Sequence, residues 1–152
     1  MKSIQERYPE PYTHCFGCGT HNQAGWHIQT YYVDGVYVGR HRVPPEYSGG
    51  WADSMYGGAI AALIDCHTAA AAADAKGREL GLTAADPLPR FVTATITVDY
   101  LAPTPAGVEV NLKARVTSIA GRKVHVSCEL FPAGSATPTA RGEVLMIQVR
   151  EP

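Results

Sequence analysis

The chain has 152 residues, with 13 Lys and Arg against 14 Asp and Glu, and a formal net charge of -1. A chain of this length buries roughly 70% of the surface that its extended form exposes, so it supports one domain with a hydrophobic core. The near-neutral charge argues against a general nucleic-acid binder or a protein drawn to anionic membranes, because both need a basic excess. The sequence starts without the apolar core of a secretory signal, and its four cysteines are too few for a disulfide scaffold. We therefore expect a soluble cytoplasmic protein with reduced thiols.

The first quarter of the chain predicts an irregular lead-in followed by a β-hairpin. Residues 1–25 carry prolines and glycines that leave little room for regular structure. Residues 26–33 and 36–43 are rich in β-forming side chains. Asp34-Gly35 between them is a strong hairpin signal, because a type I′ turn needs positive φ at both central positions.

An Ala-rich segment at residues 59–76 predicts a helix, because Ala has the highest helix propensity, and Gly77 is placed to close it. The least polar stretch around this segment, residues 55–73, is interrupted by Asp65 and His67. We interpret it as a buried helix and not as a membrane span.

The second half of the chain changes to a period of two. Apolar and polar residues alternate over residues 92–100, 108–117 and 123–130, which predicts antiparallel strands that are half-buried on one apolar face. A last run, residues 144–149, is apolar on both faces and is expected to be more deeply covered. Turns are expected between these strands, at the Pro- and Gly-containing segments.

The predicted order is two strands, one long helix and four strands. A lone helix that is apolar nearly all round must be wrapped, and a curved antiparallel sheet is the obvious wrapper. This is the layout of the hotdog fold, an α+β architecture, and we expect one such domain over residues 1–152.

Asp65 is the one charged residue between Ser54 and Ala73. Burying a carboxylate costs free energy unless the group is hydrogen-bonded or paired, so an acid in such a segment is a candidate functional group. The alternative is a narrow solvated stripe on the helix, shared with His67 or Asp74.

The pair Gly57-Gly58 stands at the entrance of the predicted helix. Free N–H groups at a helix start suit a developing oxyanion, although a plain flexible turn would carry the same sequence. Gly57 and Asp65 are eight residues apart, or about 12 Å along one helix, so they cannot easily act on one carbonyl from the same chain. Two such helices packed antiparallel across a two-fold axis would bring them together, which predicts a homodimer with shared active sites.

Four segments together resemble one protein family. The run GWADSMYGGAIAALID is similar to the helix-start signature of hotdog-fold acyl-CoA thioesterases of the PaaI-like and thioesterase superfamily member 4-like types. The runs RFVTATITVDYLAPTP and GRKVHVSCEL resemble the strand and hairpin that follow, and CFGCGTHNQAGWHI resembles the lead-in of many bacterial members. The resemblance extends from His14 to Val149.

The resemblance implies thioester hydrolysis at a dimer interface. It implies that Asp65 is the nucleophile or the general base for water, and that the Gly57 N–H polarises the thioester carbonyl. It also implies that Thr93 orients the acid or the water in the partner subunit. Tyr56 departs from the pattern, because the family usually has His at this position. Two rival functions stay open, a non-catalytic module that binds acyl-CoA and a hotdog hydratase that would use an Asp65–His67 pair.

The remaining candidates concern the substrate. Arg122 and Lys123, at a predicted hairpin tip, could meet the phosphates of coenzyme A. Trp51, Tyr56 and Gly58 are candidates for the acyl site. We expect no metal and no organic cofactor, because a thioester is already activated and coenzyme A is part of the substrate. The expected partners are the acyl-CoA substrate and further copies of the chain, as a dimer or a dimer of dimers.

The lead-in also carries a cluster of potential ligands, namely His14, Cys15, Cys18 and His21. We interpret it first as a structural turn, with a metal site and a redox pair as alternatives. Cys66 and Cys128 fall within apolar patterns and are expected to be small core residues.

Overall fold

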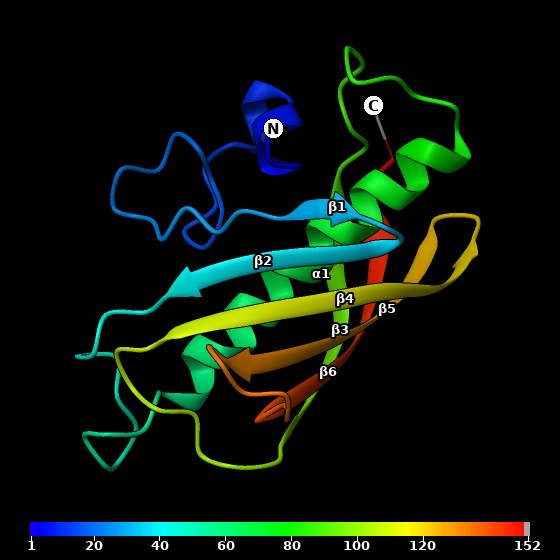
Figure 1. Cartoon of the computed structure of the whole chain (residues 1–152). Helices are drawn as coiled ribbons and strands as arrows, with labels where there is room; N and C mark the ends of the chain where they lie inside the picture. Colours follow the sequence, from blue (N-terminus) through cyan, green and yellow to red (C-terminus); the bar gives the residue numbers. More distant parts are fainter. Residues whose placement is uncertain (151–152) are drawn as a thin grey trace.

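Six antiparallel strands form one sheet in the computed structural model, which describes residues 1–150 (Figure 1). The order across the sheet is β1-β2-β4-β5-β6-β3, so β1 and β3 are the edge strands. The strands are β1 (Tyr31–Val33), β2 (Val36–Arg42), β3 (Phe91–Tyr100), β4 (Glu109–Ala120), β5 (Lys123–Pro132) and β6 (Ala140–Gln148). One long helix, α1 (Gly57–Glu79), separates β2 from β3 in the sequence, and two 3-10 turns, η1 (Gln5–Arg7) and η2 (Glu10–Tyr12), lie in the lead-in.

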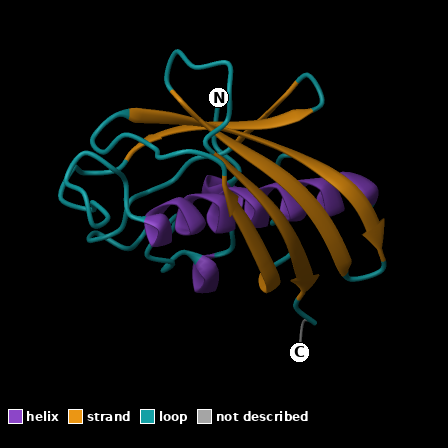
Figure 2. Ribbon diagram, turned by 90° about the horizontal axis from the view of Figure 1, so that it is seen from below, coloured by secondary structure: helices purple, strands orange, loops and turns teal. Residues whose placement is uncertain are grey.

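The sheet curls around α1, as Figure 2 shows. Alternate residues of β4, β5 and β6 point at the helix and are buried, because successive side chains of a strand face opposite sides. On β5 these residues are Val124, Val126, Cys128 and Leu130. The predicted order of elements and the hotdog fold are confirmed. Glu151 and Pro152 of the predicted domain lie outside the described residues.

The helix is longer than residues 59–76, and Gly77 does not close it. Gly77 lies inside α1 and is buried, where a Cβ would lie 3.0 Å from Leu88 Cδ2. The closing glycine is Gly81, with a φ of +73°. Gly81 N–H donates to Arg78 O and Leu82 N–H donates to Gly77 O, which is the Schellman arrangement. Among the helices of residues 1–150, none combines the length and the apolar character that a membrane crossing requires.

The first hairpin is confirmed at Asp34-Gly35, where φ is +49° and +84°. The strand before it is shorter than predicted, because residues 26–30 are irregular. Their backbone bonds to the lead-in instead: Ile28 N–H donates to Gly17 O, and Ile4 N–H donates to Thr30 O.

The prediction of one half-buried apolar face is wrong for β3. As an edge strand β3 pairs only with β6, and it leaves Val92 45% exposed and Ile96 37% exposed. The last strand, β6, also differs from the prediction, because only one of its faces is fully buried: Val144 and Met146 are covered, whereas Leu145 is partly exposed.

Candidate active site

The carboxylate of Asp65 is held by the first part of β3. Helix α1 and β3 run in opposite directions, and the Thr93 hydroxyl donates a hydrogen bond to Asp65 Oδ1. The register of β3 against β6 shifts between Thr93 and Thr95. Such an irregularity can re-aim a side chain from its regular position in the pleat. The Thr93 hydroxyl therefore contacts the acid of its own chain, whereas the resemblance implies that it orients the acid or the water in the partner subunit.

Asp65 is left without a charged partner. It is partly exposed, and no Lys, Arg or His nitrogen of residues 1–150 lies within ion-pair distance of its carboxylate. Thr93 holds one carboxylate oxygen and leaves Oδ2 with no hydrogen-bond donor from the described part of the chain. A fixed carboxylate with one free oxygen can accept a proton from water or attack an electrophilic carbon.

The start of α1 presents unpaired N–H groups. Tyr56 is the N-cap residue, and its side chain makes no capping hydrogen bond. Within residues 1–150, neither Gly57 N–H nor Gly58 N–H has a hydrogen-bond acceptor, as expected for the first turn of a helix. The Tyr100 hydroxyl donates to Gly57 O at 2.7 Å and so ties the far end of β3 to this turn. The Tyr56 ring lies against Gly58, where a Cβ would come within 2.5 Å of it.

A surface groove of about 480 Å³ opens beside this helix start. Gly57, Ile60, Tyr100 and Leu101 form part of its wall, and Trp51 contributes a ring that is 78% exposed. Tyr56 and Gly58 are not among the residues that line it. A larger hollow of about 680 Å³ lies over β1, β2 and β4, and neither Asp65 nor Gly57 lines it. The smaller groove is the one that Gly57 lines, whereas Asp65 lies outside both.

Asp65 and Gly57 stay apart within one chain. Both lie on α1, which is continuous from Gly57 to Glu79, so eight residues separate them by about 12 Å. Strand β3 contacts α1 at both points, with Thr93 bonded to Asp65 and Tyr100 bonded to Gly57. One protomer thus offers an acid at one point and free N–H groups at another.

The basic hairpin between β4 and β5 lies at the Asp65 end. Lys123 and Val92 both pair with Ile147 of β6, so they are two strand spacings apart, or about 10 Å. Arg122 Nη1 donates to Gln148 O at 3.1 Å, and both basic residues are exposed.

His67 faces away from Asp65. It is fully buried, with Nδ1 2.9 Å from the Thr30 hydroxyl and Nε2 3.1 Å from Tyr37 O. Because Nε2 faces a carbonyl, it carries the proton, and Nδ1 accepts from Thr30. Burial lowers the pKa of His67 to about 4. The Asp65–His67 pair that a hydratase would use is not formed.

The alternative of a solvated stripe shared by Asp65 with His67 or Asp74 is wrong, because both of these residues are buried. Asp74 is buried, and Arg7 Nη1 donates to its Oδ1 at 3.0 Å. Its Oδ2 accepts from Arg78 Nε at 2.6 Å and from the Tyr37 hydroxyl at 3.1 Å. An acid in an Ala run with Arg four residues later was the available signal.

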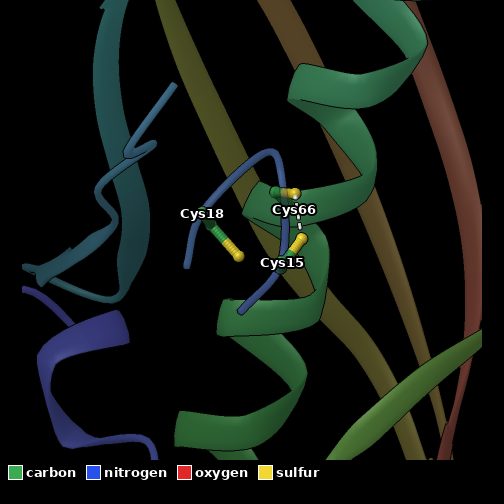
Figure 3. A group of neighbouring side chains, drawn as sticks. All are labelled: Cys15, Cys18 and Cys66. Carbon is green, nitrogen blue, oxygen red and sulfur yellow. Dashed lines mark hydrogen bonds between the residues drawn. The ribbon is translucent and has the colours of Figure 1, made fainter. Parts of the chain in front are cut away.

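Sequence reasoning missed the meeting of three cysteines. The thiols of Cys15, Cys18 and Cys66 lie together (Figure 3). His14 and His21 group separately with Glu10 on the surface. The four potential ligands of the lead-in are thus divided between two groups. Cys66 is buried, and the thiol of Cys15 lies beside it. Hydrogen bonding to the thiols of Cys18 and Cys66 lowers the pKa of Cys15.

Comparisons with known proteins agree with this architecture. The family model described as thioesterase superfamily matches residues 53–139. Acyl-coenzyme A thioesterase THEM4 of Xenopus laevis is 36% identical over 87 residues, which are 57% of this chain and 34% of that protein, so the chain spans about a third of this relative's length. A thioesterase superfamily protein of Shewanella loihica is 31% identical with a TM-score of 0.69, covering 93% of this chain and 98% of its own. The PaaI protein of E. coli, at 19% identity and a TM-score of 0.66, covers 82% and 81% and shares the fold.

Proposed function

The chain belongs to the thioesterase superfamily, and from this premise we propose that it hydrolyses acyl-CoA thioesters in the cytoplasm. The observation that carries the proposal is the Asp65 carboxylate, which is fixed by Thr93 on one oxygen and has no cation beside it within the described residues. Such an acid is oriented for chemistry and is not neutralised by a structural partner.

Asp65 acts through its free oxygen. As a general base it takes a proton from water while the water oxygen forms a bond to the thioester carbon. As a nucleophile it forms that bond itself, and water then cleaves the resulting anhydride. In either case the C–S bond breaks, the thiolate of coenzyme A leaves and takes up a proton, and a free acid is the second product. A thioester needs no metal and no organic cofactor for this step, because its carbonyl is already activated.

The oxyanion is stabilised by the Gly57 N–H. This group has no acceptor within residues 1–150 and lies at the positive end of α1, where a developing negative charge is favoured. Because Asp65 of the same chain is about 12 Å away, the Gly57 that serves Asp65 belongs to a second copy of the chain. The active unit is then a homodimer, alone or as half of a dimer of dimers.

The exposed edge of β3 supports this dimer. A free edge strand with apolar side chains, here Val92 and Ile96, is suited to pairing with another chain. Thr93 and Tyr100 are seven residues apart on β3, or about 24 Å. Antiparallel pairing of two β3 strands, centred between Ile96 and Thr97, sets Thr93 opposite Tyr100 of the partner subunit. Since Tyr100 is tied to Gly57, the same pairing brings Gly57 of the partner subunit towards Asp65.

The remaining residues contact the substrate away from the carbonyl. Arg122 and Lys123 lie at the Asp65 end, where their charges meet the phosphates of coenzyme A. Trp51 borders the groove beside the helix start and contacts the acyl group. Tyr56 and Gly58 shape the turn that presents the N–H groups.

Thiol release from short, long and aromatic acyl-CoA substrates tests the proposal. We expect hydrolysis by the wild type and a loss of about a thousandfold in kcat for Asp65→Asn, which keeps the shape but removes the base or nucleophile. Asp74→Asn changes an acid of the same helix outside the site, so it is the matched control and retains the rate while folded. An Asp65→Asn variant as fast as the wild type would exclude Asp65 from the reaction.

A second pair of variants tests the N–H donor. Gly57→Pro removes this N–H, and Pro is tolerated at the first position of a helix, where Tyr56 already has an extended ψ of 129°. Gly57→Ala is the control, because it adds a Cβ but keeps the N–H. We expect Gly57→Pro to lose about a hundredfold in kcat or more, and Gly57→Ala to lose far less.

Mixed dimers test whether the site is shared. In a dimer of one Asp65→Asn chain and one Gly57→Pro chain, one site carries both changes and the other site carries neither. Random mixing of the two variants should therefore restore about a quarter of the wild-type rate. Mixtures that stay inactive despite exchange of subunits would mean that both groups act within one chain.

The rival is a module that binds acyl-CoA without turnover. The observation that favours it is Tyr56, whose ring lies against Gly58 at the position where the family usually has His. A folded, dimeric wild type that binds acyl-CoA but releases no thiol would replace our proposal with this one.

A further inference from the structure

Three thiols from two distant parts of the chain converge beside the candidate site. Cys15 and Cys18 lie on a turn of the lead-in, and Cys66 lies on α1 directly after Asp65 (Figure 3). All three sulfur atoms lie within 4.8 Å of one another. The fourth cysteine, Cys128, is buried on β5 and does not belong to this group.

The spacing of the sulfurs matches that around one metal ion. A tetrahedral ion with metal–sulfur bonds of about 2.3 Å separates its sulfur ligands by about 3.8 Å. The distance between Cys15 Sγ and Cys66 Sγ is 3.8 Å. Cys18 Sγ lies within 4.8 Å of both, and none of the three cysteines is in a disulfide, which would need about 2.05 Å between sulfurs.

The turn that carries Cys15 and Cys18 is closed by a hydrogen bond from Gly19 N–H to Cys15 O at 2.7 Å. A Cβ on Gly19 would lie 2.6 Å from that same oxygen, and a Cβ on Gly17 would overlap Cys66 Sγ. Gly19 thus lets the turn close on its own backbone, and Gly17 lets the turn approach α1 closely enough for the sulfurs to meet.

The donor set is soft. His14 and His21 group with exposed Glu10 instead, and His21 Nδ1 is 2.9 Å from the Thr13 hydroxyl. The groups that meet at this point of the described chain are therefore thiols, which select thiophilic ions such as Zn²⁺ and Cu(I) over the hard ions that prefer oxygen.

We propose that Cys15, Cys18 and Cys66 form a binding site for one thiophilic d¹⁰ metal ion. Zn²⁺ would carry an exogenous fourth ligand, whereas Cu(I) would be held by the three sulfurs alone. The ion ties the lead-in to α1 one residue after Asp65. It takes no part in thioester cleavage and stabilises the segment on which Asp65 lies.

Metal titration of the full-length chain tests the site. Metal-free protein, kept reduced with a phosphine, is titrated with zinc chloride and separately with Cu(I) in a competing chelator. Thiol counting and mass spectrometry of the metal content follow each titration. We expect one ion per chain and protection of three of the four cysteines, and the tighter of the two ions identifies the occupant. Co²⁺, as a spectroscopic stand-in for Zn²⁺, should give sulfur-to-metal charge-transfer absorption.

Two variants and one control make the result specific. Cys15→Ser and Cys66→Ser should each weaken binding by about a hundredfold or more, because each removes one of three ligands. Cys15 is only half-buried, so its variant keeps the test open if Cys66→Ser does not fold. Cys128→Ser, at a buried cysteine outside the group, should bind as the wild type does. Stripping the ion should lower the melting temperature of wild type and Cys128→Ser and leave that of Cys15→Ser unchanged.

Two results would overturn the site. One is a reduced wild type that takes up neither ion in stoichiometric amount and keeps four reactive thiols. The other is a disulfide between two of the three cysteines in non-reducing peptide maps of protein purified without oxidant.

Discussion

Helix α1 carries two acids, Asp74 and Asp65, that differ in burial and in the number of their hydrogen-bond partners. Asp74 is 3% exposed and is met by Arg7, Arg78 and the hydroxyl of Tyr37. Asp65, nine residues earlier, is partly exposed and receives one hydroxyl from Thr93. A buried carboxylate that is fully paired supports the fold, whereas an oriented carboxylate with a free oxygen is available for a reaction. The number of partners separates the structural acid from the candidate catalytic one.

The largest effect is expected when the paired acid, Asp74, is replaced. Asp74→Asn should lower the free energy of unfolding by about 3 kcal/mol, because it leaves Arg7 without its counter-charge in a mostly buried position. Arg78 is half-exposed and is hydrated instead, which keeps the loss from being larger. Urea unfolding at a fixed protein concentration measures the change, and thiol release below the transition should stay near the wild-type rate. A stable but inactive Asp74→Asn would reverse the roles of the two acids.

His67 is a buried residue of the same helix, and its protonation makes the stability of the fold depend on pH. Its pKa is about 4 in the folded chain against an ordinary value of 6.5, so the folded state binds the proton less readily than the unfolded state does. The stability that neutral His67 contributes is complete above pH 6.5 and is lost as the pH falls towards 4. Between pH 7 and pH 4.5 this loss amounts to about 2 kcal/mol.

Unfolding of wild type and His67→Gln at pH 7 and pH 4.5 isolates this contribution. The variant should be less stable at pH 7, because Gln fits the Thr30 and Tyr37 contacts poorly. Its further loss on acidification should be smaller than that of the wild type by the amount above. Equal losses in both proteins would show that acid sensitivity arises from other groups.

Variants of Thr93 test how the carboxylate of Asp65 is oriented. Thr93→Val keeps the shape of the side chain but removes the hydroxyl that orients Asp65, so kcat should fall about tenfold with little change in KM. Thr93→Ser keeps the hydroxyl and should recover most of the rate. A Thr93→Val variant that keeps the wild-type kcat would mean that the hydrogen bond to Asp65 does not contribute to the reaction.

The sequence predicted those parts of the fold that local patterns control. Alternation along β5 predicted its buried face, and Asp34-Gly35 predicted the first turn, because both follow from neighbouring residues. The same alternation in β3 gave a wrong burial for Val92 and Ile96, since no part of residues 1–150 covers these two side chains on the edge strand. Residues 26–30 were predicted as strand from their β-forming side chains. The hydrogen bonds that tie their backbone to the lead-in join separate segments of the chain, so no local pattern indicates them.

The local signals for the candidate site were Asp65 and the Gly57-Gly58 pair, and the rest depended on distant contacts. Asp65 stood out as an acid in an Ala-rich helix, but Asp74 carries the same local signal. What distinguishes them is Arg7, 67 residues from Asp74 in the sequence, together with Tyr37. The cysteine group likewise needs a helix residue 51 positions after Cys15, which no spacing rule for ligands in one segment could find.

The smallest expected effect is the most informative about Asp65. Asp65→Asn should change the free energy of unfolding by no more than about 0.5 kcal/mol, because the site is partly exposed and Asn keeps an oxygen that accepts from Thr93. Urea unfolding measures it beside Asp74→Asn, under the same conditions and in the same oligomeric state. A loss near that of Asp74→Asn would make Asp65 a second structural acid, and any fall in its activity would then reflect a damaged helix. Near-neutral stability together with lost turnover would mean that the chain keeps this carboxylate for its reaction.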